Sequence, residues 1–342
     1  MKVLVLYKPN RKYDNFEGAR MRKSIKGALE LQNINHVDNK VDYFDVGHLI
    51  SPNQDSEINE IHDNGAPAVV SALYAESDGN VSYLEKKPNE KKSSLTTKAF
   101  KFLNKADLVL VPCESAKSLL LNSGITSRVE VCYPGVNLTR FDFSKENETE
   151  IFYRYYREDK NKKLVLSVGE YDRKMEGINA FINAARKCPN AVFYYVGRYD
   201  GRTKSRLRFK KFFKKFPKNV HFVDVPPDDV YRSALLNAAI FMVTTYKITG
   251  VTSLVEAMAA KAQIIARKSA IFEGFLEDGV TAHMGEFSET LSSLVRDFLD
   301  GKIKPTTIQA YQLVERHHLT NFGEDLINYD QLAIQNNIHR RK

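Results

Sequence analysis

Short apolar runs typical of β-strands alternate with segments of helical periodicity along nearly all of the 342-residue chain. Strands separated by helices form parallel sheets that the helices cover on both faces, so this alternation predicts an α/β fold of the doubly wound type. In the first half, strands are predicted at 2–7, 45–50, 66–73, 107–112 and 128–133, with helices from Gly18 onward and over 54–64, 94–105 and 115–123.

The alternation stops once, at the polar and unperiodic segment 142–150, and then begins again. We therefore predict two Rossmann-like domains, at 1–145 and 146–320, whose strand ends face a cleft, and a helix with a basic tail at 321–342. No strand follows the helical stretch 322–336, so it could pack back across the domain boundary. The second half is predicted to contain strands at 163–168, 191–196, 219–224, 239–244 and 262–266, and helices at 177–187, 203–216, 228–237, 252–260 and 287–299.

The composition, with 43% hydrophobic and 27% charged residues, is that of an ordinary globular protein. No apolar run reaches the roughly 18 residues that a membrane-spanning helix needs. The apolar run at the N-terminus is too short for a secretory signal and is typical of a first strand. Cys113, Cys132 and Cys188 lack the spacing of a metal site, and their odd number argues against a disulfide framework. We expect a cytoplasmic protein without a bound metal.

The formal net charge of +9 favours polyanionic partners: nucleotides, nucleic acids or an anionic membrane surface. In the densest basic segment, 202–218, four phenylalanines recur at helical spacing. Such a helix could sink its aromatic face into a bilayer, or it could bury its phenylalanines in the core of the α/β alternation. Because it keeps step with the alternation, we favour the core, and its lysine face could still attract anionic lipid. No aromatic platform accompanies the charge, so no nucleic-acid partner is expected.

Two segments of the second half together contain the residues of a nucleotide-diphosphate site. The strand LVLSVG is followed by Arg173, Lys174 and a helix near Gly177, so two cations and helical N–H groups could meet a diphosphate. Further along, GVTSLVEAMAAKAQIIAR places one acid, Glu256, in an apolar helix, where its carboxylate could accept bonds from both ribose hydroxyls. Taken singly, the basic pair could be a solvated turn and Glu256 could simply be exposed. Their combination predicts a site for a sugar nucleotide.

Two residues of the first half are further candidates. Gly18 lies where the first loop turns into the first helix, a position that faces the ligand crevice in a doubly wound fold. A glycine that merely begins a helix explains it equally well. His48 closes a predicted strand and could face the cleft, although a histidine satisfied in the core or at the surface is more common.

The motifs of the second half, in this order, resemble those of family-four retaining glycosyltransferases with the GT-B fold. YPGVNLTRF is similar to the passage of that family from its first domain to its second. The first half is similar to bacterial enzymes that add a second sugar to monoglycosyl-diacylglycerol. The segments that carry the resemblance are FEGARMRKSIKGAL, DYFDVGHLIS, GAPAVVSALYAESD, the segment from SVG through RK to Gly177, FINAARKCPNAVFYYVG, FPKNVHFVDVPPDDVYRSALLNAAIFMVTTY and TSLVEAMAAKAQIIAR.

The resemblance implies transfer of a hexose from a UDP-sugar to a lipid-linked acceptor or another cell-envelope glycan, by a peripheral protein at the inner face of the cell membrane. It implies no metal, since Arg173 and Lys174 would hold the diphosphate. Glu256 would hold the ribose, and Gly18 would let the first loop approach the phosphates. The backbone of Thr249, Gly250, Val251 and Thr252 would contact phosphate, and the residues expected on the acceptor side, as catalytic candidates, are His48, Glu76 and Asp78.

The chain departs from the family at two positions. The family pairs two glutamates, the second of which corresponds to Glu256, but the first position is occupied by Ile248. The family's histidine in the first domain should fall near Leu73, where the side chain carries no proton. These losses motivate an alternative: a catalytically impaired glycosyltransferase-like subunit that acts as a binding or regulatory partner.

Overall fold

The computed structural model describes residues 1–7, 16–50, 54–74, 84–85, 94–142, 149–169, 171, 177–197, 216–246 and 252–341. The chain divides into two compact units. Unit 1 consists of Met1–Asn137, Ile248–Thr252 and His317–Lys342, and unit 2 consists of Leu138–Lys247 and Ser253–Arg316.

Unit 1 is built on a six-stranded sheet in which every described pair of neighbouring strands is parallel. The order is β2-β1-β3-β4-β7-β8. The two central strands β3 and β4 are buried at every residue, as expected for continuous apolar runs covered on both faces. The strands are β1 (Lys2–Tyr7), β2 (Asn35–Val37), β3 (Val46–Ile50), β4 (Ala68–Ser71), β7 (Leu108–Val111) and β8 (Arg128–Val131).

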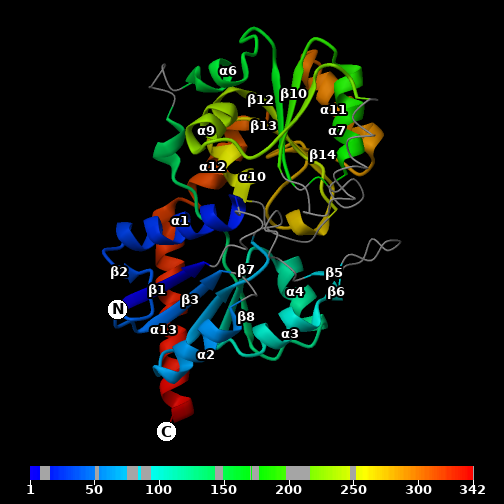
Figure 1. The fold of residues 1–342 in the computed structure, drawn as a ribbon. Helices are drawn as coiled ribbons and strands as arrows, with labels where there is room; N and C mark the ends of the chain where they lie inside the picture. Colours follow the sequence, from blue (N-terminus) through cyan, green and yellow to red (C-terminus); the bar gives the residue numbers. More distant parts are fainter. Residues whose placement is uncertain are drawn as a thin grey trace. The chain divides into compact units, whose positions relative to one another are not determined.

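The last helix of the chain, α13 (Leu319–Arg341), belongs to unit 1. It packs against α1 (Phe16–Leu31), and both helices share a core with the sheet (Figure 1). Phe322 and Leu326 of α13 are buried there with Met21 and Ile25 of α1. The other elements of this unit are α2 (Asp55–Asp63), α3 (Thr97–Leu103), α4 (Glu114–Asn122) and the short antiparallel pair β5 (Leu84–Glu85) and β6 (Ser94–Leu95).

Unit 2 contains a second six-stranded parallel sheet, with the order β11-β10-β9-β12-β13-β14. Its strands are β9 (Leu164–Val168), β10 (Val192–Val196), β11 (Val220–Val223), β12 (Ala238–Val243), β13 (Gln263–Arg267) and β14 (His283–Gly285). Its helices are α6 (Ile151–Tyr156), α7 (Ile178–Lys187), α9 (Asp228–Asn237), α10 (Thr252–Ala259), α11 (Ser288–Leu299) and α12 (Thr307–Glu315), with 3-10 turns η1 (Leu138–Phe141) and η2 (Ala270–Phe272).

The periodicity of α7 explains how it packs. Ile178, Phe181, Ile182 and Ala185 form its apolar stripe, and all four are buried against the sheet and α11. The ring of Phe181 meets that of Phe193 on β10 edge to face at 5.3 Å. Helices α7 and α11 run side by side over this sheet (Figure 1).

Each sheet has one point at which the strand order reverses. In unit 1 the reversal lies between β1 and β3, and in unit 2 it lies between β9 and β12. Open α/β sheets bind ligands in the crevice beyond the carboxyl ends of the strands at this point. A ligand site is therefore expected beyond the carboxyl ends of these four strands.

The predicted α/β fold with two doubly wound parallel sheets is confirmed, and the last helix does return to the first unit. Strand ends differ by one or two residues from the predicted ranges. Sequence reasoning missed the three-residue strands β2 and β14 and the helices α6 and α12. The predicted helix 203–216 lies outside the described residues except for Phe216.

Candidate functional site

The carboxyl ends of β9, β10 and β12 meet at two close backbone contacts that only glycine permits. Gly177 precedes α7 with φ of 64°, and a Cβ atom there would overlap the carbonyl oxygen of Thr244, just beyond β12. Gly197, just beyond β10, would overlap the carbonyl oxygen of Gly169 in the same way. The beginning of α7 is therefore held directly against the reversal point of the unit 2 sheet.

This placement makes the N-terminus of α7 suitable for an anion. The first N–H groups of a helix have no partner inside the helix and carry the positive end of its dipole. The residue that precedes α7, Gly177, has no side chain that could cap them. The chain that leads to the helix is anchored at Tyr171, whose buried hydroxyl donates a hydrogen bond to the carbonyl oxygen of Val223. The predicted phosphate ligands Arg173 and Lys174 lie outside the described residues.

A buried arginine that sequence reasoning did not select stands beside this helix. Arg267 ends β13, is 2% exposed, and donates from Nε to the carbonyl oxygen of Thr244 at 2.7 Å and from Nη1 to that of Glu286 at 2.5 Å. Its guanidinium lies over the ring of Tyr246, 3.9 Å from the centroid. Burial lowers the pKa of Arg267, while Tyr246 acts in the opposite direction.

Glu256 is buried in α10 rather than exposed, which rules out the simpler interpretation of its place in an apolar helix. Its Oε1 lies 3.8 Å from Nη1 of Arg140, on η1. The same guanidinium donates from Nη2 to Oδ1 of Asp228, at the start of α9, at 2.5 Å. A carboxylate at this depth needs a cation or hydrogen bonds, and Arg140 supplies the cation.

The remaining residues predicted near Glu256 are only partly described. Thr252 begins α10 and is buried, and its hydroxyl has no hydrogen-bond partner in the part of the chain that the structure describes. Thr249, Gly250 and Val251, and Ile248 before them, lie outside the described residues.

Gly18 lies at the reversal point of the unit 1 sheet. It is buried in the first turn of α1, and a Cβ atom there would lie 2.6 Å from Cε2 of Tyr7, the last residue of β1. The glycine therefore lets the ring of Tyr7 pack against the helix. Its predicted contact with a ligand loop concerns residues outside those described.

His48 does not face a cleft as expected, because its ring is fully buried inside unit 1. It lies two residues before the end of β3, where Nε2 is 2.6 Å from Oγ of Ser71 and Nδ1 is 3.9 Å from Oδ1 of Asp330 on α13. Burial lowers the pKa of His48 to about 4 and raises the pKa of Asp330 to about 8. The commoner interpretation, a core histidine, is thus correct. Glu76 and Asp78 lie outside the described residues.

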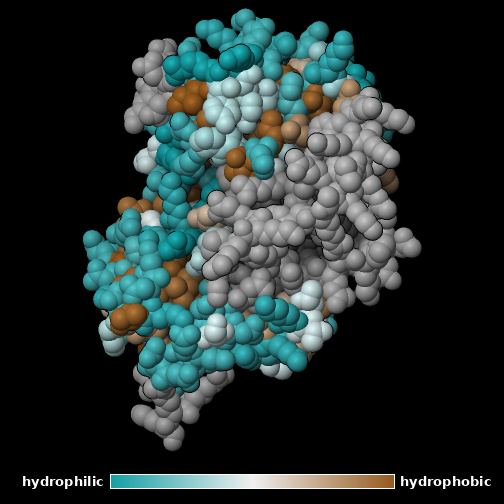
Figure 2. Space-filling view, viewed as in Figure 1, coloured by the Kyte–Doolittle hydropathy of each residue, from teal (hydrophilic) through white to brown (hydrophobic). Residues whose placement is uncertain are grey.

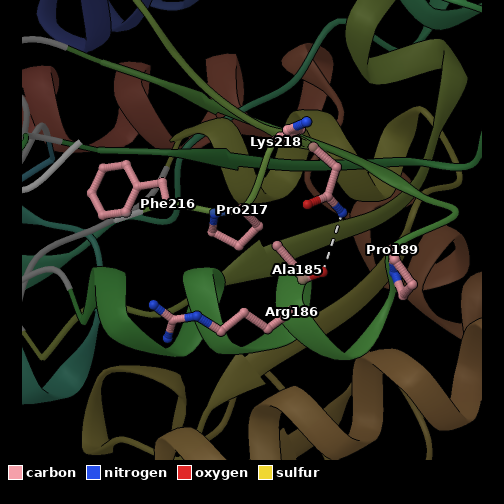
Figure 3. Close-up of a pocket in the computed structure, with 7 residues that line it drawn as sticks. Ala185, Arg186, Pro189, Phe216, Pro217 and Lys218 are labelled. Atoms are coloured by element: carbon pink, nitrogen blue, oxygen red, sulfur yellow. Dashed lines mark hydrogen bonds between the residues drawn. The ribbon is translucent and has the colours of Figure 1, made fainter. Parts of the chain in front are cut away.

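A surface pocket of about 430 Å³ lies at the opposite, amino edge of the unit 2 sheet (Figure 3). Phe216 and Pro217 lie on one side of it, and the end of α7 with Ala185 and Arg186 lies on the other. Asn219 closes its base by donating to the carbonyl oxygens of Ala185, Cys188 and Ala191. Since it is far along the strands from the reversal point, we do not assign the candidate site to it.

The described residues contain no group of three or more His, Cys, Asp or Glu side chains arranged to hold a metal ion. None of the described helices combines the length and apolarity needed to cross a bilayer. On the face drawn in Figure 2, hydrophobic residues appear as separate spots among hydrophilic ones in the described part of the surface.

One family model matches part of the chain. Residues 149–313, which belong almost entirely to unit 2, match the model of glycosyl transferases group 1. This range runs from before α6 to near the end of α12 and includes Glu256 and Arg267. No curated protein matches the sequence significantly.

Several solved structures are similar over almost the whole chain. HepE from Anabaena, in complex with UDP-glucose, has a TM-score of 0.72 at 13% identity, covering 96% of this chain and 99% of that one. Sucrose-phosphate synthase from Thermosynechococcus elongatus has a TM-score of 0.71 at 13% identity, with 97% and 98% covered. A glycosyltransferase from Rickettsia africae has a TM-score of 0.67 at 14% identity, with 98% and 99% covered. The chain therefore has the GT-B fold, and residues 149–313 are similar to the glycosyl transferases group 1.

Proposed function

We propose that this protein is a retaining glycosyltransferase that moves a hexose from a UDP-sugar to a lipid-linked acceptor or another cell-envelope glycan. The observation that carries the proposal is the N-terminus of α7, held against the end of β12 by Gly177 and lacking a side-chain cap. A diphosphate fits this position because helical N–H groups and the helix dipole both favour an anion. The similarity to HepE, whose structure contains UDP-glucose, supports a UDP-sugar as the donor.

Each part of the donor would have its own partner. Arg173 and Lys174 follow β9 and precede α7, so their charges would bind the diphosphate and stabilise it as the leaving group. Glu256 would accept hydrogen bonds from the ribose hydroxyls. Arg140 would keep that carboxylate charged and oriented, because its guanidinium is fixed between Glu256 and Asp228. The backbone from Thr249 to Thr252 would contact phosphate, and no metal is needed where these cations act.

The experiment that tests the donor site is calorimetric titration of the purified chain with UDP, UDP-glucose, UDP-galactose and GDP. We expect binding of UDP and of at least one UDP-sugar, and weaker binding of GDP. Lys174→Ala should weaken UDP binding sharply, since it removes a charge from the diphosphate. The matched control is Lys302→Ala, an exposed lysine that pairs with Asp300 on unit 2. Unchanged UDP affinity in Lys174→Ala would disprove the phosphate role.

If the acceptor is linked to a lipid, we expect the protein to contact an anionic membrane through its basic segment 202–218. Co-sedimentation with vesicles of phosphatidylglycerol and phosphatidylcholine, compared with phosphatidylcholine alone, tests this contact. We expect more protein in the pellet with the anionic vesicles, and less difference as salt rises. Equal partitioning into both vesicles would disprove an electrostatic docking surface.

A second candidate function is that of a catalytically impaired subunit that binds a nucleotide and regulates a partner. Leu73, at the expected position of the family histidine, is fully buried, and its φ of 62° points to a backbone fixed in an uncommon conformation. His48 is buried as well and takes no part in the surface of unit 1. UDP-sugar binding without hydrolysis or transfer to any glycolipid acceptor would favour this function over the enzyme.

A further inference from the structure

We propose that Arg267 binds a phosphate oxygen of the diphosphate together with the N-terminus of α7. The buried guanidinium would then offset part of the negative charge of the bound diphosphate. The inference rests on the proposed function for the identity of the ligand, and on the geometry of unit 2 for the site itself. Neither composition nor motif singled out this residue; its position in the fold did.

The guanidinium of Arg267 is fixed from three sides. Nε and Nη1 donate to the carbonyl oxygens of Thr244 and Glu286, which lie beyond β12 and β14. The ring of Tyr246 lies against the plane of the guanidinium. A guanidinium held in one orientation loses little conformational entropy when it binds a ligand, so it is preorganised.

One nitrogen of this guanidinium has nothing to bind in the described structure. Nη2 of Arg267 is buried and lacks a hydrogen-bond acceptor among the described residues. No described carboxylate lies within ion-pair distance of Arg267 either, in contrast to Arg140. An arginine remains charged at any physiological pH, so burial leaves a charge and an N–H group that favour an anionic acceptor.

Nη2 lies next to the beginning of α7. A Cβ atom on Gly177 would stand 3.0 Å from Nη2, so the missing side chain leaves this nitrogen beside the uncapped N–H groups of the helix. Two independent features, a helix N-terminus and an unpaired buried guanidinium nitrogen, therefore point to the same small volume. A phosphate oxygen satisfies both, because it accepts several hydrogen bonds and carries negative charge.

The test compares ligands that differ only in phosphate: UDP, uridine and inorganic pyrophosphate, titrated into wild type, Arg267→Lys and Arg267→Gln. If Arg267 contacts phosphate, Arg267→Gln weakens UDP and pyrophosphate by about tenfold or more and leaves uridine unchanged. Arg267→Lys keeps the positive charge but loses the planar guanidinium, so its affinity for UDP and pyrophosphate should lie between those of the wild type and Arg267→Gln. Arg296→Gln, which removes an exposed arginine paired with Asp297, is the control.

The outcomes separate the inference from the proposed function. If the wild-type protein binds pyrophosphate but not UDP, the anion site is supported and the proposed nucleotide donor is refuted. Wild type that binds UDP, with an unchanged ratio of UDP to uridine affinity in both Arg267 variants, refutes the role of Arg267 alone. A purely structural arginine would lower UDP and uridine affinity together, which also overturns the inference. Wild type that binds neither phosphate ligand overturns both proposals.

Should both variants fail to fold, the side-chain NMR signals of ¹⁵N-labelled arginine in the Arg173→Gln protein decide the question. Buried guanidinium N–H groups exchange slowly and give resolved signals, and Arg173→Gln removes the other arginine expected at the diphosphate. Pyrophosphate should shift one protected arginine signal and uridine should not. If pyrophosphate shifts no protected signal, Arg267 does not bind the anion.

Discussion

One buried polar cluster in unit 1 and the buried charged groups in unit 2 lie beside similar parallel sheets, but burial affects their charge in opposite ways. The cluster of unit 1 is His48, Ser71 and Asp330, and the charges compared with it in unit 2 are the buried Arg267 and the pair of Arg140 with the buried Glu256. Arg20 and Asp107 of unit 1 are buried as well. Burial lowers the pKa of His48 to about 4 and raises the pKa of Asp330 to about 8, so both groups are neutral near pH 7. The arginines of unit 2 cannot lose their charge in this way.

The different charge of the two groups indicates different roles for them. A neutral cluster costs less to bury, and this one lies where α13 packs against β3 and β4. A charge that stays inside unit 2 without a partner is costly to bury, and under the proposed function a nucleotide diphosphate would be that partner. Four sets of substitutions test this contrast.

The largest effect is expected where unit 2 allows backbone to touch backbone. Gly197→Ala would push a methyl group into the carbonyl oxygen of Gly169, and neither strand end can move without loss of sheet hydrogen bonds. We expect a loss of about 3 kcal/mol in the free energy of unfolding. Gly47→Ala in unit 1 is the matched change, since its methyl group would meet only the side chain of Ile61, and about 1.5 kcal/mol is expected there. Chemical denaturation of both variants measures the difference; equal losses would contradict the distinction.

The next effect concerns the charge pair of unit 2. Arg140→Met removes the cation that lies 3.8 Å from the buried carboxylate of Glu256 while keeping most of the side-chain volume. Leaving that carboxylate without its cation should cost about 2 to 3 kcal/mol in unfolding free energy. It should also reduce the preference for UDP over 2′-deoxy-UDP, since Glu256 would no longer be held toward the ribose. A variant with normal stability and normal ribose preference would show that Arg140 does not position Glu256.

The buried acid of unit 1 should make stability depend on pH. Since the pKa of Asp330 is raised on folding to about 8, the folded state holds a proton that the unfolded chain has released, and stability falls as pH rises toward 8. The lowered pKa of His48, about 4, has the opposite effect between about pH 4 and 6.5 and offsets it there. A net loss of about 2 kcal/mol is therefore expected between about pH 6.5 and 8.

Asp330→Asn should abolish that loss, because the amide does not titrate. Thermal unfolding of wild type and variant at intervals from pH 6 to 8.5 provides the measurement. Parallel curves for the two proteins would show that Asp330 does not carry the proton. Arg128→Met, on the surface of the same unit, controls for general charge effects.

The smallest effects are expected at the surface, where the two units should not differ. Arg128 pairs with Glu130 in unit 1, and Arg296 pairs with Asp297 in unit 2, and all four side chains are partly exposed. Arg128→Met and Arg296→Met should each leave the midpoint of chemical denaturation unchanged within the error of the measurement. A clear loss of stability in either variant would mean that exposed pairs contribute to the contrast as well.

Most of the fold was predictable from the sequence because the central strands of both sheets are continuous apolar runs bounded by helices of clear periodicity. Strand β14 was not, because three residues between turns give no periodic signal. The residues of the candidate site were harder to predict from the sequence. Arg267 ends an apolar strand, QIIAR, and a terminal arginine is normally expected in solvent. The one available signal was the apolar run 262–266 directly before it, because such a run indicates a strand that is covered on both faces.

The burial of His48 could not be predicted from the local sequence either. Its place at the end of a predicted strand suggested that it could face the cleft, but Asp330 and the rest of α13 cover it, and they come from the far end of the chain. The ion pair of Arg140 and Glu256 likewise joins residues on separate elements. Contacts of this kind depend on tertiary packing, which local patterns do not encode.

The return of α13 to unit 1 has a consequence for how the protein is made. A ribosome releases β1 to β8 long before it has synthesised α13, and the whole of unit 2 is translated in between. Until then, Met21 and Ile25 of α1 lack the apolar side chains of Phe322 and Leu326 that bury them in the finished protein. Unit 2 is nearly continuous in sequence and can fold as it emerges, so the first unit to be synthesised is the last to be completed.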